Sequence, residues 1–216
     1  MARGDFDAVL WDFGGVILSS PFESFNKYEA ANGLPKDFIR GLNATNPDTN
    51  AWAKMERSEV SLAEFCELFE EEAVVAGGKL VGADVLAMLR GELRPQMVEA
   101  QQRIKAAGIR QALLTNNFSS EDEDGGGFSR PELSHAMEVY DCVIESSKAG
   151  VRKPDPAAYE LVLEALADVP AERIVYLDDL GINLKPARGL GMTTIKVIDP
   201  DDALRELGEH LGLELL

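Results

Sequence analysis

Short apolar runs alternate along this chain with segments of helical periodicity, and this alternation limits the folds open to it. The runs lie at residues 8–11, 111–114, 142–144, 174–177 and 193–197. Apolar runs of this length are typical of strands buried on both faces, and intervening helices join such strands into parallel βαβ units. We therefore expect an α/β fold with a doubly wound parallel sheet.

A long helical stretch interrupts this alternation after the first run. Residues 21–94 carry apolar side chains at helical spacing, such as Leu62 and Phe65, and show no strand pattern. Ser61 followed three residues later by Glu64 predicts a capping box at the start of one helix. We expect a small all-helical domain inserted into the sheet domain. The expected boundaries are residues 19–94 for the helical domain, and residues 1–18 with 95–216 for the α/β core.

Polar residues follow three of the predicted strands at the point where each strand ends. Asp12 follows the first run, Thr115 the second, and Asp178 with Asp179 the fourth. Taken singly, each could be an ordinary turn or helix-capping residue. Parallel strands, however, bring their carboxyl ends to one edge of the sheet, where ligands bind in open α/β folds. The repetition at one edge therefore predicts a functional site.

The charge of the chain argues against two classes of partner. It holds 21 lysines and arginines against 38 aspartates and glutamates, a formal net charge of −17. Such a surface repels nucleic-acid phosphates and anionic lipid head groups, so we expect neither nucleic acid nor a membrane as a partner. An anionic small molecule would bind only where a cation or a bound metal reverses the local field.

Targeting signals and cysteine usage favour a cytoplasmic protein. The N-terminus lacks the basic region and long apolar stretch of a signal peptide. No apolar run approaches the roughly 20 residues of a membrane helix. The two cysteines, Cys66 and Cys142, form no metal-ligand or disulfide pattern. The oligomeric state stays open, with a homodimer as one alternative.

The carboxylates at the strand ends indicate a metal site. Asp12 and Asp179 would repel each other at one sheet edge unless a positive charge lay between them. Oxygen ligands without a nearby histidine or cysteine favour Mg²⁺ over zinc. A carboxylate in this place can also act as a nucleophile and form an acyl phosphate.

Two further segments supply groups that suit a phosphate. Thr115 and Asn116 offer a hydroxyl, an amide and backbone N–H groups. Lys153 could neutralise the nucleophile and the transferring charge, although alone it reads more simply as a surface lysine. Three other features are interpreted as surface features: the acidic segment 121–124, His135 and His210.

Together these segments resemble the motifs of the haloacid dehalogenase (HAD) superfamily. The family's four motifs correspond to residues 12–16, 114–116, 152–156 and 176–179. The helical stretch is similar to the small helical cap of subfamily I, and residues 178–188 closely resemble the N-terminal phosphatase domains of soluble epoxide hydrolases. The resemblance implies a HAD-like Rossmannoid core and a hydrolase that acts on a phosphate ester.

The resemblance also implies roles in catalysis and substrate binding. Asp12 would be the nucleophile that attacks phosphorus. Thr115 and Asn116 would bind the transferring phosphoryl group, and Lys153 would pair with that group and with Asp12. Lys148 is a competing lysine, but Lys153 matches the Lys-Pro pair of this branch.

The same resemblance implies a Mg²⁺ site and a small phosphorylated substrate. The metal ligands would be Asp12, the backbone carbonyl of Gly14, and Asp179. Asp178 and Asn183 would not bind the metal directly but would hold its ligands in position.

Gly14 departs from the family pattern. The family has an aspartate here that acts as general acid–base, a contribution of ~10²–10⁴-fold in rate. A glycine still offers a carbonyl to a metal, but it transfers no proton. Two functions therefore stay open: a slow or selective phosphatase, and a weak or inactive module that binds Mg²⁺ and a phosphorylated ligand or mediates dimerisation. Metal-free dehalogenation is disfavoured, because it leaves the paired acids unused.

Selectivity is expected to depend on residues of the helical domain that face the sheet edge. Phe22, Trp52 and Met55 are candidates, and their apolar character would suit a lipid-like or aromatic phosphate. Apolar side chains at helical spacing are, however, more often core residues.

Overall fold

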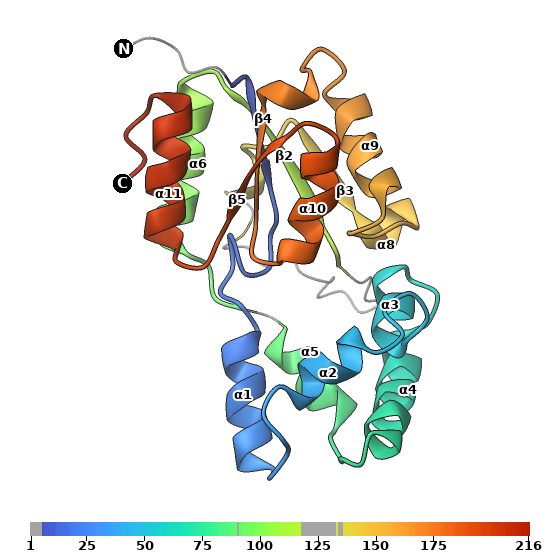
Figure 1. Ribbon diagram of the computed structural model, residues 1–216. Coiled ribbons are helices and arrows are strands. Elements are labelled where there is room, and N and C mark those ends of the chain that lie inside the picture. The colour runs from blue at the N-terminus through green and yellow to red at the C-terminus, as the bar shows by residue number, and fades with distance from the viewer. Residues whose placement is uncertain (1–5, 90, 118–132, 134–135) are drawn as a thin grey trace.

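The fold is built on a parallel sheet, as the alternating sequence pattern predicts (Figure 1). The computed structural model describes residues 6–89, 91–117, 133 and 136–216. The acidic segment 121–124 and His135 lie outside the described residues. Within the described chain, the sheet has five strands in the order β3-β2-β1-β4-β5. The strands are β1 (Ala8–Trp11), β2 (Arg110–Thr115), β3 (Cys142–Glu145), β4 (Ile174–Asp178) and β5 (Thr193–Lys196).

Strand β1 occupies the centre of the sheet and pairs on both sides. Ala8 lies opposite Arg110 of β2 and Ile174 of β4, and every pairing in the sheet is parallel. The chain builds one half of the sheet with β2 and β3 and then crosses to the other side of β1 with β4. The strand order therefore reverses between β1 and β4, which is where ligands bind in folds of this kind.

Helices cover both faces of the sheet, so its strands are buried on both sides. Val9 and Trp11 of β1 belong to one hydrophobic cluster, while Ala8 and Leu10 belong to another. Figure 1 shows α6 and α11 on one face and α9 and α10 on the other. This layering confirms the doubly wound α/β class. The helix bounds are α6 (Pro95–Ala106), α9 (Pro156–Ala165), α10 (Gly181–Gly189) and α11 (Pro200–Leu211).

The last helix, α11, ends before the C-terminus of the chain. α11 stops at Leu211, because Gly212 adopts a left-handed φ of 66° and closes the helix. His210, in its last turn, is half-buried and packs against the Phe6 ring, so its description as a plain surface residue was wrong. The pattern also missed two single-turn helices, which are too short to show a period: α8 (Ser146–Ala149) and η1 (Ala171–Arg173).

The helical stretch between β1 and α6 forms a cluster of helices below the carboxyl ends of the strands (Figure 1). We call residues 22–88 the helical insertion. Its helices share one hydrophobic core, which includes Phe25, Phe65 and Phe69. The capping box of Ser61 and Glu64 is confirmed. The helix bounds are α1 (Phe22–Ala31), α2 (Phe38–Ala44), α3 (Ala51–Glu56), α4 (Leu62–Val75) and α5 (Gly82–Met88).

Two chain segments connect the helical insertion to the sheet, and they lie side by side. Leu18 and Leu93 form an antiparallel bridge, and the Arg94 N–H donates to the Ile17 carbonyl at 2.9 Å. The pairing falls at the expected boundaries between residues 18 and 19 and between 94 and 95. The division into two domains there stays a prediction. None of the described helices is long and apolar enough to cross a membrane.

Candidate active site

The crevice between β1 and β4 brings three carboxylates together. Asp12 follows β1, Asp178 ends β4, and Asp179 comes next. One oxygen from each lies within 4.8 Å of the others. The strand ends therefore converge as the sequence predicts, and the sheet supplies a dense negative charge at its carboxyl edge.

Lys153 lies among these carboxylates and is buried. Its side chain is only 1% exposed, with Nζ 2.7 Å from Asp12 Oδ1 and 2.8 Å from Asp178 Oδ2. The alternative of a surface lysine is therefore wrong. Burial opposes the charge, but the two carboxylates outweigh it and hold the pKa of Lys153 above its ordinary value. The competing lysine, Lys148, is exposed and pairs with Glu145.

One ammonium does not balance three carboxylates. Burial raises the pKa of Asp12 well above its ordinary value, and the charge of Lys153 opposes this rise. Burial and the neighbouring Asp178 raise the pKa of Asp179 to about 6. Both shifts disfavour the charged carboxylates, and a cation beside them would oppose these shifts. An all-oxygen donor set of this kind fits a hard divalent cation such as Mg²⁺.

Asp178 is held on both carboxylate oxygens by other groups. Oδ2 accepts from Lys153 and from the Tyr176 hydroxyl, and Oδ1 accepts from the Leu180 N–H at 2.7 Å. The Asn183 amide lies 3.1 Å from each oxygen. A carboxylate with so many donors is fixed in place, which suits the supporting role implied for Asp178 and Asn183.

The loop after β1 contains two glycines with different surroundings. Gly15 adopts a φ of +81°, and a Cβ there would lie 2.3 Å from Asp179 Oδ2. Gly15 therefore lets Asp179 approach the loop closely. Gly14 is exposed, and a Cβ there would meet nothing within 4 Å. The loop begins with the Phe13 N–H, which donates to Asp12 Oδ1 at 2.7 Å.

The residues after β2 contact the loop that carries Lys153. Thr115 is buried at the end of β2. The Asn116 side chain accepts from the Lys153 N–H at 2.9 Å and donates to the Lys153 carbonyl at 3.0 Å. The amide of Asn116 is thus engaged with the Lys153 backbone. If Asn116 contacts a phosphoryl group, as the family resemblance implies, it does so through its backbone N–H.

Arg94 is a site residue that the sequence reasoning missed. Its Nη1 donates to the Gly15 carbonyl at 2.9 Å, and its charge lowers the pKa of Asp179, against the larger effect of burial. Pro95 marks this position as a helix start, but nothing in the local pattern places the preceding arginine beside the loop after β1.

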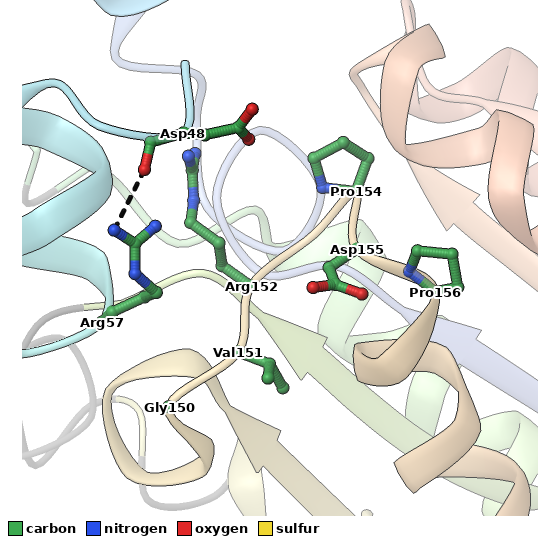
Figure 2. A pocket seen from close by; sticks show the side chains of 8 residues that line it. All are labelled: Asp48, Arg57, Gly150, Val151, Arg152, Pro154, Asp155 and Pro156. Carbon is green, nitrogen blue, oxygen red and sulfur yellow. Dashed lines mark hydrogen bonds between the residues drawn. The ribbon is translucent and has the colours of Figure 1, made fainter. Parts of the chain in front are cut away.

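The apolar candidates for selectivity are core residues. Trp52 and Met55 are buried in the core of the helical insertion, and Phe22 packs against it. A pocket of about 420 Å³ lies between the insertion and the outer side of the loop that carries Lys153 (Figure 2). Lys153 does not line it, because its side chain points to Asp12. The lining residues are Asp48, Arg57, Gly150, Val151, Arg152, Pro154, Asp155 and Pro156.

The fold and the site together define an α/β protein with a Rossmann-like sheet and an aspartate cluster at its carboxyl edge. The chain belongs to the haloacid dehalogenase-like hydrolase family, whose sequence pattern it matches over residues 6–191.

Curated relatives cover nearly the whole chain. Acyl-CoA dehydrogenase family member 10 of Mus musculus is 35% identical over 97% of this chain. Bifunctional epoxide hydrolase 2 of Sus scrofa is 32% identical over 97% of this chain. The chain spans only 20% and 39% of those two proteins, respectively. A sesquiterpene phosphatase of Aspergillus oryzae is 24% identical, with 96% of this chain and 97% of that protein covered.

Solved structures share the fold. A HAD-like family hydrolase from Porphyromonas gingivalis superposes with a TM-score of 0.67 and 19% identity, covering 97% of this chain and 99% of that one. A HAD family enzyme from Bacteroides thetaiotaomicron, in complex with magnesium and inorganic phosphate, gives a TM-score of 0.58 and 18% identity, covering 88% and 93%.

Proposed function

We propose that the protein is a Mg²⁺-dependent phosphatase that acts on a small phosphomonoester through a phospho-aspartate on Asp12. One observation carries the proposal: a buried lysine bridges Asp12 and Asp178 beside a third carboxylate. Such an arrangement fixes a positive charge beside a carboxylate nucleophile at the carboxyl edge of the sheet, and phosphoryl transfer depends on positioning and charge stabilisation of this kind. The sesquiterpene phosphatase of Aspergillus oryzae, one of the relatives, supports this reaction class.

The first step is attack on phosphorus by Asp12. Lys153 and the Phe13 N–H both bind Oδ1, so we assign the attack to Oδ2. The new bond joins Oδ2 to phosphorus, and the bond from phosphorus to the ester oxygen breaks. Lys153 favours the ionised form of Asp12, which burial disfavours. The departing oxygen takes its proton from water, because Gly14 has no acid to offer.

The second step is hydrolysis of phospho-Asp12. A water oxygen bonds to phosphorus, the bond to Oδ2 breaks, and the water proton leaves to solvent or to the phosphate. Lys153 again stabilises the carboxylate that forms. Without a base at position 14, this step limits the rate, and leaving groups that need little protonation react best in the first step.

Asp12, Asp179 and the carbonyl of Gly14 would hold Mg²⁺. When bound, the metal supplies positive charge to the phosphoryl oxygens and to the carboxylates. The three carboxylates of Asp12, Asp178 and Asp179 lie close enough to share an ion, which supports this proposal, and the neighbour from Bacteroides thetaiotaomicron was crystallised with magnesium and phosphate.

A second candidate function is a module that binds Mg²⁺ and a phosphorylated ligand without efficient turnover. Gly14 is the observation that favours it, because the general acid–base of the family pattern is absent there. In both cases we propose a small phosphorylated ligand and a cytoplasmic protein, with neither nucleic acid nor membrane as partner. A homodimer stays a proposal as well.

Phosphate release from a panel of phosphomonoesters tests the first candidate. The wild type and Asp12→Asn would each be assayed with Mg²⁺ and with EDTA. Release that requires Mg²⁺ and disappears in Asp12→Asn is the expected result. If no ester is turned over faster by the wild type than by Asp12→Asn, the second candidate becomes the better account. Release that is indifferent to EDTA would contradict the metal site.

A further inference from the structure

A single residue of the helical insertion touches the sheet domain at several loops. Glu56, at the end of α3, is only 8% exposed. Its Oε2 lies 2.5 Å from Arg152 Nε and 3.3 Å from Asn116 Nδ2. Its backbone carbonyl accepts from Ser146 Oγ at 2.7 Å. Glu56 therefore contacts the loop after β2, the start of α8 after β3, and the loop that carries Lys153.

Neighbouring contacts hold the same segment of the insertion in place. The Arg152 Nη1 donates to the Pro47 carbonyl at 2.9 Å, and Ser58 Oγ donates to the Ser147 carbonyl at 3.2 Å. Within the insertion, Trp52 Nε1 donates to Glu56 Oε1 at 3.0 Å. The Glu56 side chain is thus fixed by its own helix on one side and directed to the sheet domain on the other.

Two of these partners set the position of Lys153. Asn116 binds the Lys153 backbone at both its N–H and its carbonyl, and Arg152 precedes Lys153 in the chain. Glu56 contacts both Asn116 and Arg152. Removing its charge leaves the largely buried Arg152 guanidinium without its carboxylate, and the loop must then rearrange to solvate it.

We propose that Glu56 is a positioning residue, through which the helical insertion holds the Lys153 ammonium between Asp12 and Asp178. The inference rests on the proposed function, because Lys153 acts on a phosphoryl group only if that function is correct. Glu56 acts on the Lys153 ammonium through the loop, by its contacts with Asn116 and Arg152. The insertion is then a part of the active site's framework as well as its cover.

Glu56→Gln tests the proposal, with Glu59→Gln as its matched control. Glu59 lies on the same segment and pairs with Arg57, which also belongs to the insertion. Steady-state kinetics on the best substrate of the panel would give kcat and KM for each variant. Hydrogen exchange would be followed in peptides that cover residues 115–117 and 150–155, with and without Mg²⁺.

In Glu56→Gln we expect kcat to fall roughly 10- to 100-fold, since a displacement of about 1 Å costs a factor of this size. KM should change less than kcat, because the displaced Lys153 ammonium acts mainly on charge that develops in the transition state, and exchange in both peptides should accelerate. Glu59→Gln should match the wild type in every measurement. If Glu56→Gln fails to fold, Arg152→Gln breaks the same link from the other side and carries the same expectations.

Other results would overturn the proposal. A Glu56→Gln variant with a lower melting temperature but the kcat of the wild type would show that Glu56 only fastens the insertion to the sheet domain. Unchanged exchange at residues 150–155 would show that Glu56 does not hold the loop. If the wild type itself turns over no ester, the proposed function fails, and the exchange result alone then decides whether Glu56 orders the loop.

Discussion

Two adjacent glycines in the loop after β1 differ in what a side chain would meet. At Gly14 the surroundings are open, and its φ lies outside the left-handed region, so an aspartate fits there without strain. At Gly15 the left-handed φ and the contact with Asp179 forbid any side chain. Gly14 therefore lacks only the carboxylate of the family's second aspartate, and the backbone at this position can still accommodate an aspartate.

The first prediction follows from this difference. Gly14→Asp should raise kcat for phosphate release by up to ~10²-fold, the lower end of a general acid–base contribution, because the new carboxylate can move the proton that the wild type leaves to water. Steady-state kinetics with Mg²⁺ measures it. Gly15→Ala is the matched control, and it should lose Mg²⁺ binding because its Cβ displaces Asp179. An unchanged kcat in a Gly14→Asp variant that folds and binds Mg²⁺ would count against a competent site.

The second prediction concerns the ammonium of Lys153. Lys153→Met keeps an unbranched side chain one heavy atom shorter but removes the ammonium, which leaves Asp12 and Asp178 to face each other in a buried site. We expect kcat to fall by ~10²–10³-fold, as for the loss of one electrostatic contact to the transition state. Lys148→Met, which alters an exposed lysine nearby, should leave kcat unchanged. Equal kcat values for the two variants would remove Lys153 from the mechanism.

Among the structural elements, the helices of the insertion pack at different distances from one another. Gly82 begins α5 where α5 crosses α4, and a Cβ at this position would lie 2.6 Å from the Cys66 Cα. Gly41 lies within α2, and a Cβ there would meet nothing within 4 Å. One glycine is thus required by helix packing, and the other only adds conformational freedom to the unfolded chain.

The third prediction compares these glycines. Gly82→Ala should lower the free energy of unfolding by about 1–3 kcal/mol, because the helices must separate. Gly41→Ala should raise it by about 0.5–1 kcal/mol, because alanine favours the helix and restricts the unfolded chain. Urea unfolding of both variants gives the two values. If Gly82→Ala proves as stable as the wild type, α4 and α5 do not pack as closely as described.

The elements were predictable from the sequence, whereas several of their contacts were not. The apolar runs that end at Asp12, Thr115 and Asp178 located the strands, because strands buried on both faces are continuously apolar. The strand ends in turn located the site. The contacts of Glu56 and Arg94 could not be found in this way, since each depends on how the helical insertion folds back on the sheet. Asn116 was found, but its partner in the structure is the Lys153 backbone.

At the level of the whole molecule, the net negative charge opposes the binding of the anionic substrate that we propose for the site. The formal net charge of −17 repels an anionic substrate, and the carboxylate cluster adds to this repulsion. Lys153 is one cation between two of these carboxylates, and Arg94 adds a second near Asp179. A divalent cation in the cluster would relieve the repulsion and create a local positive field for a phosphate.

The last prediction concerns the stability of the whole protein as pH changes. Asp179 has a pKa of about 6 in the folded protein against an ordinary value of 3.8, and the pKa of Asp12 is raised as well. The folded state therefore holds these protons more tightly than the unfolded state. The stability that the Asp179 proton contributes below about pH 4 is lost as pH rises through 6. Each such proton contributes at most about 1.4 kcal/mol per pH unit. Because Mg²⁺ binds the deprotonated carboxylates, it replaces the stabilisation that the protons gave up.

The gain in melting temperature from saturating Mg²⁺ should accordingly be larger at pH 7 than at pH 5. Thermal unfolding with Mg²⁺ and with EDTA at each pH measures this gain. It also cancels the contribution of carboxylates far from the site, such as Asp168, whose pKa is lowered by its hydrogen bond with Arg110. Asp179→Asn should abolish most of the Mg²⁺ effect and flatten the pH dependence in EDTA, because an amide neither titrates nor attracts the metal strongly. Equal gains at both pH values in the wild type would mean that Mg²⁺ and protons do not compete for Asp12 and Asp179, and that the metal binds elsewhere.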